Sequence, residues 1–492
     1  MNVAALIDWP EDALADYPLA LWTSEEIAAA VGGMASGPFQ VAGVEIDSRD
    51  VQEGDLFFAL KGESMDGHRF LDAAFRQGAA AAVVDRPVPY PHILVADTTK
   101  ALELLAKAAR LRVTGVATVL GVTGSVGKTS VKEALFAALD RAAAGRAHRS
   151  VKSYNNHVGV PLSLARMPAG SRFGVFEMGM NHAGEIAALT TQVRPHVALI
   201  TSIAPAHIEN LGSEEAIADA KAEIFAGLEP GGTAIIPADT VHRERLCAAA
   251  ATLGVKVVTF GRAADADVRV MDVVSAPGGG SLVTADMGDR RLCYTIAAPG
   301  EHWVLNSLAV MAAVRAAGGD LGAAGLALAE LEGLKGRGAR HALRVDGGEA
   351  LLIDESYNAN PASMAATLAQ LGATAAKRRI AVLGAMKELG EHGPQFHAAL
   401  AGPLAAAGVD YAILVGAEIS ALASKLEISG ELGKSDGGAL GKAIPFAHCH
   451  DASEAHNALV AFGVESGDVI LVKGSNSVGL GKLVEALIAK EG

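Results

Sequence analysis

GVTGSVGKTS, residues 121–130, stands between an apolar, β-branched run at 116–122 and a segment with helical spacing at 131–140. A strand, a glycine turn and a helix in this order bring backbone N–H groups and a helix N-terminus together around a polyphosphate. The context therefore predicts a phosphate-binding turn at the heart of an α/β domain.

The residues of this turn suit a polyphosphate ligand. Gly124 and Gly127 let phosphate oxygens approach the backbone. Lys128 supplies a positive charge, and Thr129 or Ser130 supplies a hydroxyl for Mg²⁺. Turn glycines followed by a chance Lys-Thr pair are the alternative, and the flanking strand and helix argue against it. We therefore expect the chain to bind a nucleoside triphosphate.

Bulk properties narrow the class of protein. A chain of 492 residues is too long for one core, so about three domains are expected. Half of the residues are hydrophobic and only 4% are aromatic, which is typical of helices packed on sheets. The net charge of −14 argues against a nucleic-acid-binding surface. A nucleotide must then be held by local cations, Mg²⁺ and helix ends.

Targeting and redox signals point to the cytoplasm. The N-terminus carries acids where a signal peptide needs basic residues, and no apolar run is long enough to span a bilayer. Cys247, Cys293 and Cys449 lie far apart, which fits neither a disulfide framework nor a clustered metal site. We expect a soluble, monomeric cytoplasmic protein without a membrane span.

Residues 1–113 are expected to form a small α/β domain. Within 41–70, short apolar strands end in loops that carry clustered polar residues. Polar groups on loops at strand ends are typical of ligand sites, and solvated turns are an equally good interpretation. The residues concerned are Asp47, Ser48, Arg49 and Lys61.

Residues 114–340 are expected to form the nucleotide-binding domain, on a mostly parallel sheet. A strand within 171–186 carries Glu177, an acid that emerges from an apolar run. A buried carboxylate is costly unless it is paired or binds a metal, so Mg²⁺ is the expected partner beside a P-loop. A salt-bridged glutamate at a strand end is the alternative. Short antiparallel strands are expected from 262 to 298, and a glycine-broken loop at 331–340 marks the domain boundary.

Residues 341–492 are expected to form a doubly wound, Rossmann-like α/β domain. Four apolar strands, at 349–356, 378–386, 411–417 and 468–475, alternate with Ala- and Leu-rich helices. This alternation favours a parallel sheet with ligands at its carboxyl edge. Asparagines near that edge serve equally well as turn and cap residues. The candidates are Tyr357, Asn358, Asn360, Lys473, Gly474 and Ser475.

Seven motifs in order resemble one known family. They are DSRDVQEGDLFFALKGE, TGSVGKTS, YNNHVGVPLSL, EMGMNHAGEI, AHIENLGS with AKAEIF, DESYNANPASM and ILVKGS. On these motifs, which cover nearly the whole chain, the protein resembles the Mur ligases, ATP-dependent amide-forming enzymes of peptidoglycan assembly. It is most similar to the branch that adds D-alanyl-D-alanine to UDP-N-acetylmuramoyl-tripeptide through an acyl phosphate.

The resemblance implies a role for each motif. The implied UDP-substrate residues are Asp47, Ser48, Arg49, Lys61, Asn155 and Asn156. The implied ATP-binding residues are Gly124, Ser125, Val126, Gly127, Lys128, Thr129, Ser130, Asn306, Arg337, Asp354 and Glu355. The implied dipeptide-binding residues are Tyr357, Asn358, Asn360, Lys473, Gly474 and Ser475, and the implied catalytic residues are Lys128, Asn181, His182, His207, Lys221 and Arg337.

The resemblance also implies two Mg²⁺ ions. Thr129 and Glu177 would hold one of them. His207 and Lys221 would hold the second, with Lys221 converted by CO₂ to a carbamate that behaves as a carboxylate. Most helix lysines are solvated, but one that is desolvated beside a metal loses its proton.

Three positions depart from the family pattern. Trp303 follows His302 where the family often has asparagine, and it is predicted either to stack on the adenine or to belong to the core. The pair Asp354–Glu355 replaces a common Asp-Asp, which leaves open which acid contacts the ligand. Asn476 stands where arginine is common.

Two other functions fit parts of the sequence. A ligase of the same superfamily that adds single amino acids or resembles folylpolyglutamate synthetase is one, and the long N-terminal domain argues against the latter. A non-enzymatic nucleotide switch is the other, although the chain lacks a guanine-reading NKxD motif.

Overall fold

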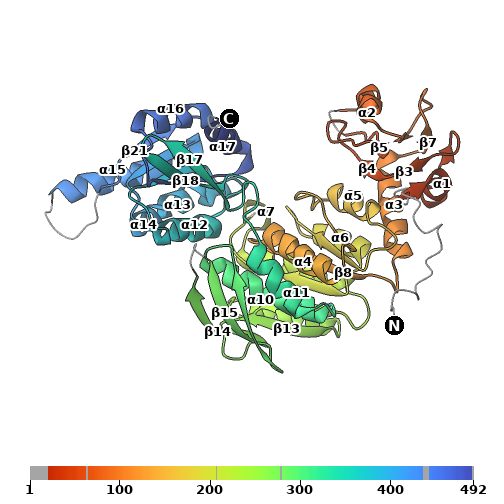
Figure 1. Cartoon of the computed structure of the whole chain (residues 1–492), viewed down its shortest axis with the longest axis horizontal. Coiled ribbons are helices and arrows are strands. Elements are labelled where there is room, and N and C mark those ends of the chain that lie inside the picture. Colours follow the sequence, from red (N-terminus) through yellow and green to blue (C-terminus); the bar gives the residue numbers. More distant parts are fainter. Residues whose placement is uncertain (1–19, 63–64, 207, 277–279, 436–442, 490–492) are drawn as a thin grey trace, which may run out of the picture. The chain divides into compact units, whose positions relative to one another are not determined.

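The computed structural model describes residues 20–62, 65–206, 208–276, 280–435 and 443–489 (Figure 1). The chain divides into two compact units. The smaller comprises residues 1–114 with 161–170, and the larger comprises residues 115–160 with 171–492.

The smaller unit is an α/β domain, as predicted. Its elements are β1 (Trp22–Thr23), α1 (Ser24–Val31), β2 (Met34–Ala35), β3 (Gln40–Val41), β4 (Gly43–Glu45), β5 (Asp55–Phe58), η2 (Gly67–Phe70), α2 (Leu71–Gln77), β6 (Ala81–Val84), β7 (His92–Leu94) and α3 (Thr98–Arg112). Five of the strands form a sheet in the order β2-β7-β6-β5-β4, in which β2 runs antiparallel to β7 and the other pairs are parallel. Thr23 and Glu26 form a capping box at α1, and Gly32 ends the helix at φ +65°.

A second segment of chain completes the smaller unit. Helix α5 (Gly159–Ala165) leads into it, and the carbonyl oxygen of Ala165 accepts a 2.8 Å hydrogen bond from Trp22 Nε1. The guanidinium of Arg166 pairs with the carboxylate of Glu45. The guanidinium of Arg112 donates to the carbonyl oxygen of Leu21 at 2.9 Å, and it also donates to Met167. Buried charges paired in this way hold residues 161–170 firmly in the unit.

The first sheet of the larger unit has nine strands. They are β8 (Thr118–Thr123), β9 (Ala147–Arg149), β10 (Phe173–Glu177), β11 (Val197–Ile200), β12 (Thr233–Pro237), β13 (Lys256–Gly261), β14 (Val268–Ser275), β15 (Ser281–Asp286) and β16 (Arg291–Ile296). Their order is β16-β15-β14-β13-β12-β11-β8-β10-β9. The pairs from β9 to β14 are parallel, whereas β14, β15 and β16 are antiparallel. The predicted antiparallel addition is therefore confirmed, and it continues the same sheet.

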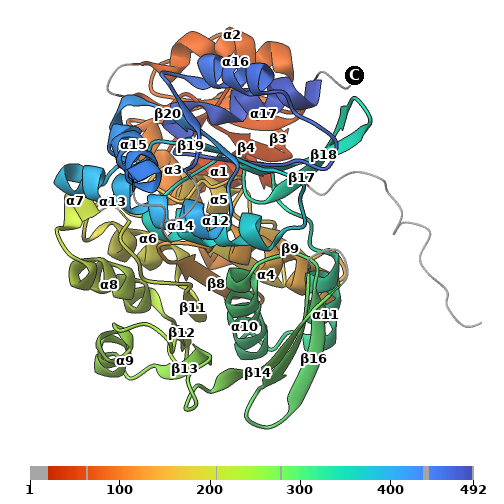
Figure 2. The ribbon, with the colours of Figure 1, turned by 90° about the vertical axis from the view of Figure 1, so that its left-hand side faces the viewer.

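Helices cover both faces of this sheet, as Figure 2 shows. The helices are α4 (Lys128–Ala142), α6 (Glu185–Val193), α7 (Ile208–Leu211), α8 (Glu214–Ala222), η3 (Glu223–Gly227), α9 (Arg243–Thr252), α10 (Glu301–Ala316) and α11 (Leu321–Glu330). On one face α4, α10 and α11 pack in a single core with the strands, and this core includes Leu135, Leu308 and Leu328. The core fixes α4 against β8, so the turn between them is rigidly supported.

The second sheet of the larger unit has six strands in the order β17-β18-β22-β19-β20-β21. They are β17 (Ala339–Val345), β18 (Gly348–Glu355), β19 (Arg379–Gly384), β20 (Tyr411–Val415), β21 (Phe446–Cys449) and β22 (Val469–Lys473). Only β17 is antiparallel to its neighbour. The four predicted strands are thus found, and β17 and β21 are two strands that the sequence pattern did not reveal.

This sheet is doubly wound, as predicted (Figure 1). Its helices are α12 (Pro361–Ala373), η4 (Gly390–His392), α13 (Gly393–Ala399), α14 (Ala401–Ala406), η5 (Ala417–Ile419), α15 (Ser420–Ser435), α16 (Ala452–Phe462), η6 (Asn476–Val478) and α17 (Leu480–Ala489). One apolar cluster joins the sheet to α12, α14 and α15, and a second joins it to α16 and α17.

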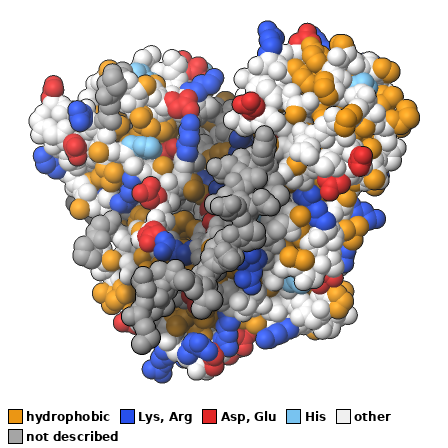
Figure 3. Space-filling view, turned by 45° about the vertical axis from the view of Figure 1, so that its right-hand side comes forward, with side chains coloured by type: hydrophobic (Ala, Val, Ile, Leu, Met, Phe, Trp, Pro, Cys, Tyr) orange, Lys and Arg blue, Asp and Glu red, His pale blue; other side chains and the backbone are white. Residues whose placement is uncertain are grey.

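Three further observations concern membrane-spanning helices, the cysteines and the surface charge. In the parts of the chain that the structure describes, no helix has both the length and the apolar character needed to cross a membrane. The three cysteines are free thiols. On the face shown in Figure 3, basic and acidic side chains are interspersed rather than gathered into one basic surface.

The core of the second sheet provides a stability test. Ile413 in β20 is fully buried, whereas Ile428 in α15 is 52% exposed. Ile413→Ala should lower the free energy of unfolding by about 2–5 kcal/mol because it leaves a cavity. Ile428→Ala is the matched control and should change it by no more than about 0.5 kcal/mol. Chemical denaturation followed by circular dichroism measures both, and equal effects would contradict the described burial.

Candidate active site

The phosphate-binding turn lies where the sequence predicts it, between β8 and α4. Strand β8 pairs with β10 on one side and β11 on the other, so the turn emerges from the middle of the sheet. Gly124 has φ +145°, and a Cβ there would lie 2.0 Å from Thr201 Oγ1. Gly127 has φ +89° and precedes the first turn of α4. Both glycines are therefore required by the backbone path and by close packing.

The loop after β11 braces the turn. Ser125 Oγ donates to the carbonyl oxygen of Ala204 at 2.9 Å and accepts from its N–H at 3.0 Å. Val126 N–H donates to Ser202 Oγ at 3.0 Å, and Ser202 Oγ donates to the Val126 carbonyl at 3.1 Å. The backbone of the turn is thus fixed before any ligand binds, which lowers the entropic cost of binding.

Glu177, at the end of β10, is fully buried beside the turn. One carboxylate oxygen accepts from Thr129 Oγ1 at 2.8 Å, and the other accepts from Asn155 Nδ2 at 2.8 Å. The Glu177 backbone N–H donates to Ser150 Oγ at 3.1 Å. The acid that sequence reasoning assigned to a metal therefore lies against the predicted metal-binding hydroxyl.

Lys132 holds the segment that supports Glu177. Its ammonium is fully buried and donates to the carbonyl oxygens of Ser150 at 3.0 Å and Lys152 at 2.7 Å. Glu133 Oε1 lies 2.7 Å from the same ammonium. Lys152 has φ +52°, a conformation that is unfavourable for a residue with a side chain. The lysine therefore stabilises a strained loop, and nothing in the sequence motif singled it out.

Two lysine amines, Lys128 and Lys221, face the same cavity. Lys128 Nζ donates to the carbonyl oxygen of Gly124 at 2.7 Å. Burial lowers the pKa of Lys128, and the neighbouring Glu177 opposes that effect. Burial also lowers the pKa of Lys221 well below its usual value, and the positive charge of Lys128 adds to the shift. Among the described residues no acidic group opposes these two effects on Lys221.

The acids at the end of β18 have different surroundings. Asp354 accepts from Gly336 N–H at 2.7 Å and from Ser356 Oγ at 2.6 Å, so it braces the backbone. Glu355 lies 3.4 Å from the ammonium of Lys473, which also donates to the Asn358 carbonyl at 2.9 Å. Burial lowers the pKa of Lys473, and Glu355 opposes that effect. Of the two acids, Glu355 is the one that lines the cavity.

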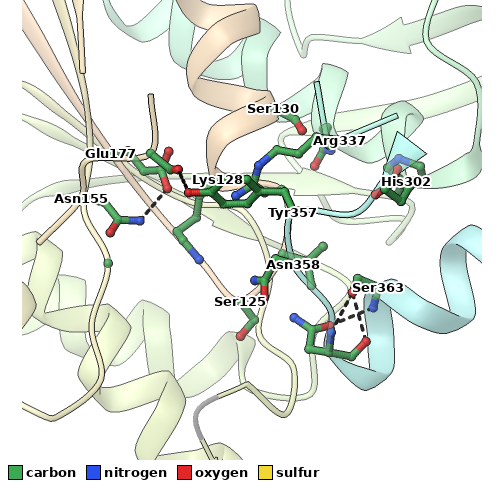
Figure 4. A pocket seen from close by; sticks show the side chains of 18 of the residues that line it. Ser125, Lys128, Ser130, Asn155, Glu177, His302, Arg337, Tyr357, Asn358 and Ser363 are labelled. Atoms are coloured by element: carbon green, nitrogen blue, oxygen red, sulfur yellow. Dashed lines mark hydrogen bonds between the residues drawn. The ribbon is translucent and has the colours of Figure 1, made fainter. Parts of the chain in front are cut away.

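Arg337 and Tyr357 complete the wall of the cavity. The guanidinium of Arg337 lies 4.5 Å above the ring centre of Tyr357. The Tyr357 hydroxyl is hydrogen-bonded to the hydroxyl of Ser153. Figure 4 shows Arg337 and Tyr357 in the same pocket as Lys128 and Glu177. The charged side chains of two sheets thus converge on one space.

This cavity has a volume of about 340 Å³. It brings together most of the residues predicted for ATP and dipeptide binding. These are Ser125, Val126, Gly127, Lys128, Ser130, Asn306, Arg337, Glu355, Tyr357, Asn358, Asn360 and Lys473. The cavity is also lined by residues predicted for other roles: Asn155 and Asn156 for the UDP-linked substrate, Glu177 for Mg²⁺, and Asn181 and Lys221 for catalysis.

Other predicted residues lie elsewhere. Gly124 and Thr129 lie beneath the cavity in the turn and in α4. Gly474 packs against Gly384, with only 3.0 Å between a Cβ there and the Gly384 Cα, and Ser475 accepts from Lys387 N–H at 3.0 Å beside a second cavity. His182 is exposed, with its Nδ1 3.2 Å from Glu185. His207 lies outside the described residues.

Two open interpretations are resolved in part by the geometry. Trp303 is only 8% exposed and belongs to the core around α10, while its remaining surface lines the cavity next to His302. Burial lowers the pKa of His302. Asn360 caps α12 through a capping box with Ser363 and also lines the cavity. Asn360 can therefore both cap the helix and contact a ligand in the cavity.

The cavity has lining residues that were not predicted as site residues. They are Ser153, Gly179, Met180, Glu185, His302, Gly336, Ser363, Ala366 and Thr367. Several of them lie inside the motifs quoted above or next to a predicted residue: Gly179, Met180 and Glu185 belong to EMGMNHAGEI, Ser363 belongs to DESYNANPASM, and His302 and Gly336 precede Trp303 and Arg337. Ser153, Ala366 and Thr367 lie outside these motifs, and no local sequence pattern indicates that they reach the cavity.

The polar residues of the smaller unit form a separate group. Arg49 Nε donates to Asp47 Oδ1 at 2.9 Å, Ser48 is buried, and Lys61 pairs in a backbone bridge with Asp66. These residues belong to one unit, whereas Asn155 and Asn156 belong to the other. That all six bind one UDP-linked substrate stays a prediction.

The donor set suits a hard cation held partly by phosphate. In the described ranges no three His, Cys, Asp or Glu side chains gather as a metal site. Glu177 and the Thr129 hydroxyl are oxygen donors, and Mg²⁺ typically takes one or two carboxylates and completes its shell with phosphate oxygens and water. The residues present therefore fit a Mg²⁺ ion that accompanies a bound nucleotide.

A glycine turn after a central parallel strand, with a lysine, a hydroxyl and a buried acid around it, defines a P-loop nucleotide-binding domain. The chain belongs to the Mur ligase family. Residues 40–124 match the family's catalytic-domain description, residues 122–314 its middle domain, and residues 340–476 its glutamate ligase domain.

Relatives and solved structures agree on one branch. The chain is 36% identical to the UDP-N-acetylmuramoyl-tripeptide--D-alanyl-D-alanine ligase of Synechocystis sp., over 90% of the chain and 91% of that relative. MurF from Acinetobacter baumannii superposes with a TM-score of 0.80 at 29% identity, covering 96% of this chain and all of that one. MurF from Thermotoga maritima, solved in complex with ADP, superposes with a TM-score of 0.70 at 27% sequence identity. The match covers 91% of this chain and 97% of that one.

The role of Lys132 is testable by removing its charge. Lys132→Met should remove the ammonium that donates to the carbonyls of Ser150 and Lys152 and lower the free energy of unfolding by about 1–3 kcal/mol. It should also weaken Mg²⁺ activation, because the segment that supports Glu177 loosens. Thermal melting and a Mg²⁺ titration of activity measure both. Lys425→Met, on an exposed lysine of α15, is the control; equal behaviour of the two variants would contradict the assignment.

Proposed function

We propose that this protein is an ATP-dependent amide ligase that joins D-alanyl-D-alanine to the carboxylate of UDP-N-acetylmuramoyl-tripeptide. The observation that carries the proposal is the single cavity onto which the P-loop and the carboxyl ends of β18 and β22 both open. A nucleotide site and an amine-substrate site that share one cavity suit a reaction in which phosphate is transferred before the amide forms.

The chemistry requires positive charge at this place. A carboxylate and an ammonium do not condense at neutral pH, so the carboxylate must first become an acyl phosphate with a good leaving group. The carboxylate and the γ-phosphate are both anions. Lys128 and Arg337, which line the same cavity, would shield their approach and stabilise the charge that develops.

The other residues would position the reactants. Asn306 and Ser130 would contact the nucleotide, while Tyr357, Asn358 and Lys473 would face the incoming dipeptide. Mg²⁺ held by Glu177 and Thr129 supplies further neutralisation of phosphate charge. Asp354 would act by bracing the turn that carries Arg337, because its carboxylate accepts from Gly336. Exclusion of water by this enclosed surface would protect the acyl phosphate from hydrolysis.

The UDP-linked substrate is assigned to the smaller unit together with Asn155 and Asn156. Asp47, Ser48, Arg49 and Lys61 form a polar group at strand ends there, which is the usual position of ligand contacts. We place the protein in the cytoplasm, where ATP is available and free cysteines are stable, and we propose that it acts as a monomer.

An amine panel tests the proposed activity. Purified protein with ATP, Mg²⁺ and UDP-N-acetylmuramoyl-tripeptide should release ADP and phosphate with D-alanyl-D-alanine, but not with single amino acids or without an amine. Lys128→Ala should abolish this release while remaining folded, since it loses several kcal/mol of transition-state stabilisation. Turnover with single amino acids alone would instead favour another ligase of the family.

We further propose that Lys221 carries a carbamate and binds a second Mg²⁺ together with His207. The lowered pKa of Lys221 supports this, because only a neutral amine attacks CO₂. Activity should fall in CO₂-depleted buffer and return with bicarbonate, and Lys221→Ala should be inactive in both buffers while folded. Lys335→Ala, on an exposed and ion-paired lysine, should respond to CO₂ as the unaltered protein does. An unmodified Lys221 amine in an active crystal would refute the proposal.

A further inference from the structure

The loop between β10 and α6 carries Asn181, a predicted catalytic residue, to the wall of the active-site cavity. Met178 and Met180, at the start of this loop, are buried, whereas residues 181–185 are all exposed. An exposed loop buries little apolar surface, so its hydrogen bonds largely decide where it lies. The position of Asn181 therefore depends on how the end of this loop is held.

The loop ends at the first turn of α6, which has no capping side chain of its own. The N-cap residue is Gly184, at φ +88°, and no side chain at that position accepts a hydrogen bond from the helix. The first N–H groups of an α-helix have no partner within the helix. They need an acceptor from another part of the chain.

Glu223 supplies that acceptor. It is the first residue of η3 and follows α8 directly. Its Oε1 accepts from the N–H of Gly184 at 2.6 Å, and its Oε2 accepts from the N–H of Ala187 at 3.1 Å. A carboxylate suits the positive end of a helix dipole better than a neutral acceptor does. Glu223 thus caps α6 from a separate element of the chain.

The body of α6 is held against η3 by other contacts. Thr190 Oγ1 donates to the carbonyl oxygen of Ile224 at 2.8 Å, and both residues are fully buried. Gly227 lies so close to the Thr190 carbonyl oxygen that no Cβ fits between them. The contribution of Glu223 is therefore local to the first turn of α6 and to the loop that precedes it.

The first turn of α6 holds Asn181 in turn. Glu185 Oε2 accepts from the Asn181 N–H at 2.6 Å. On the other side, Lys221 stands two residues before Glu223, is only 2% exposed and lines the same cavity as Asn181. Hydrogen bonds therefore connect Asn181 through Glu185 and Gly184 to Glu223, and the backbone connects Glu223 to Lys221.

We infer that Glu223 is a positioning residue, which fixes the place of Asn181 relative to Lys221 in the active-site cavity. The inference rests on the proposed function and adds to it a residue that no sequence motif assigned. Glu223 is not among the described residues that line the cavity, so it acts through the loop and not on the reactants. A misplacement of about 1 Å in a reacting site is enough to slow a reaction substantially.

Glu223→Gln tests the inference because it keeps the size of the side chain and removes one acceptor oxygen and the charge. The kcat for ADP release with D-alanyl-D-alanine should fall by about tenfold or more. The KM values for ATP and for D-alanyl-D-alanine should stay within about twofold, because the loop at 181–185 is not assigned to either ligand. Thermal melting should show a folded protein at the assay temperature, since the contacts of Thr190 remain.

Glu229→Gln is the matched control. Glu229 pairs with Arg194 at 2.8 Å, at the other end of α6. This variant removes a tether from the same helix far from the loop, so its kcat should stay within about twofold of the unaltered protein's. A similar loss of kcat in both variants would overturn the inference, because it would show a general effect on α6.

A double-mutant cycle identifies the residue through which Glu223 acts. Asn181→Ala should lower kcat, and the addition of Glu223→Gln should lower it no further, because the side chain that is positioned has been removed. Effects that multiply in the double variant would overturn the inference. So would a full kcat in either single variant, or a Glu223→Gln protein that does not fold.

The unaltered protein distinguishes failure of this inference from failure of the proposed function. If the unaltered protein turns over D-alanyl-D-alanine and Glu223→Gln does so equally well, only the role of Glu223 is wrong. If the unaltered protein uses no amine of the panel, the proposed activity is wrong and the role of Glu223 is wrong with it.

Discussion

Concentrated positive charge at the carboxyl end of β8 is the constraint on which the site depends. Lys221 and Lys473 are buried there, and the half-buried Lys128 and Arg337 line the same cavity, in a chain whose net charge is −14. Buried cations repel one another and lose hydration, so they persist only because the fold holds them in place. The cost is offset when anionic groups bind, so the cavity suits phosphate and carboxylate groups.

The framework that holds these charges is largely backbone and packing. The P-loop is fixed by the loop after β11, Glu177 is fixed by Thr129, Asn155 and Ser150, and Arg337 follows a turn braced by Asp354. These supports come from the ends of different strands, which belong to the two sheets of the larger unit. The net negative charge of the chain favours solubility. The cations that line the cavity favour the binding of anionic ligands.

Much of the fold follows from local sequence signals. The capping box at Thr23 and Glu26, the glycines of the P-loop and the apolar strand runs predicted elements that the structure contains. Strands β9, β17 and β21 were not predicted. Each lies at an edge of its sheet, so its residues are only partly buried and lack a continuous apolar run. The sequence could not show which of the adjacent acids Asp354 and Glu355 lines the cavity. Neighbouring strand residues point to opposite faces, and only the fold decides which face meets the site. Lys132 needed the structure, because its role is defined by its burial and by the two carbonyls to which it donates.

The return of residues 161–170 to the smaller unit has a topological consequence. The polypeptide passes between the two units three times, near residues 114, 160 and 170, rather than once. A single proteolytic nick therefore cannot release the smaller unit as an intact fragment, and a gene segment that ends at residue 114 would lack a partner for Trp22 and Glu45. Two separate fragments joined end to end would not reproduce this path of the chain.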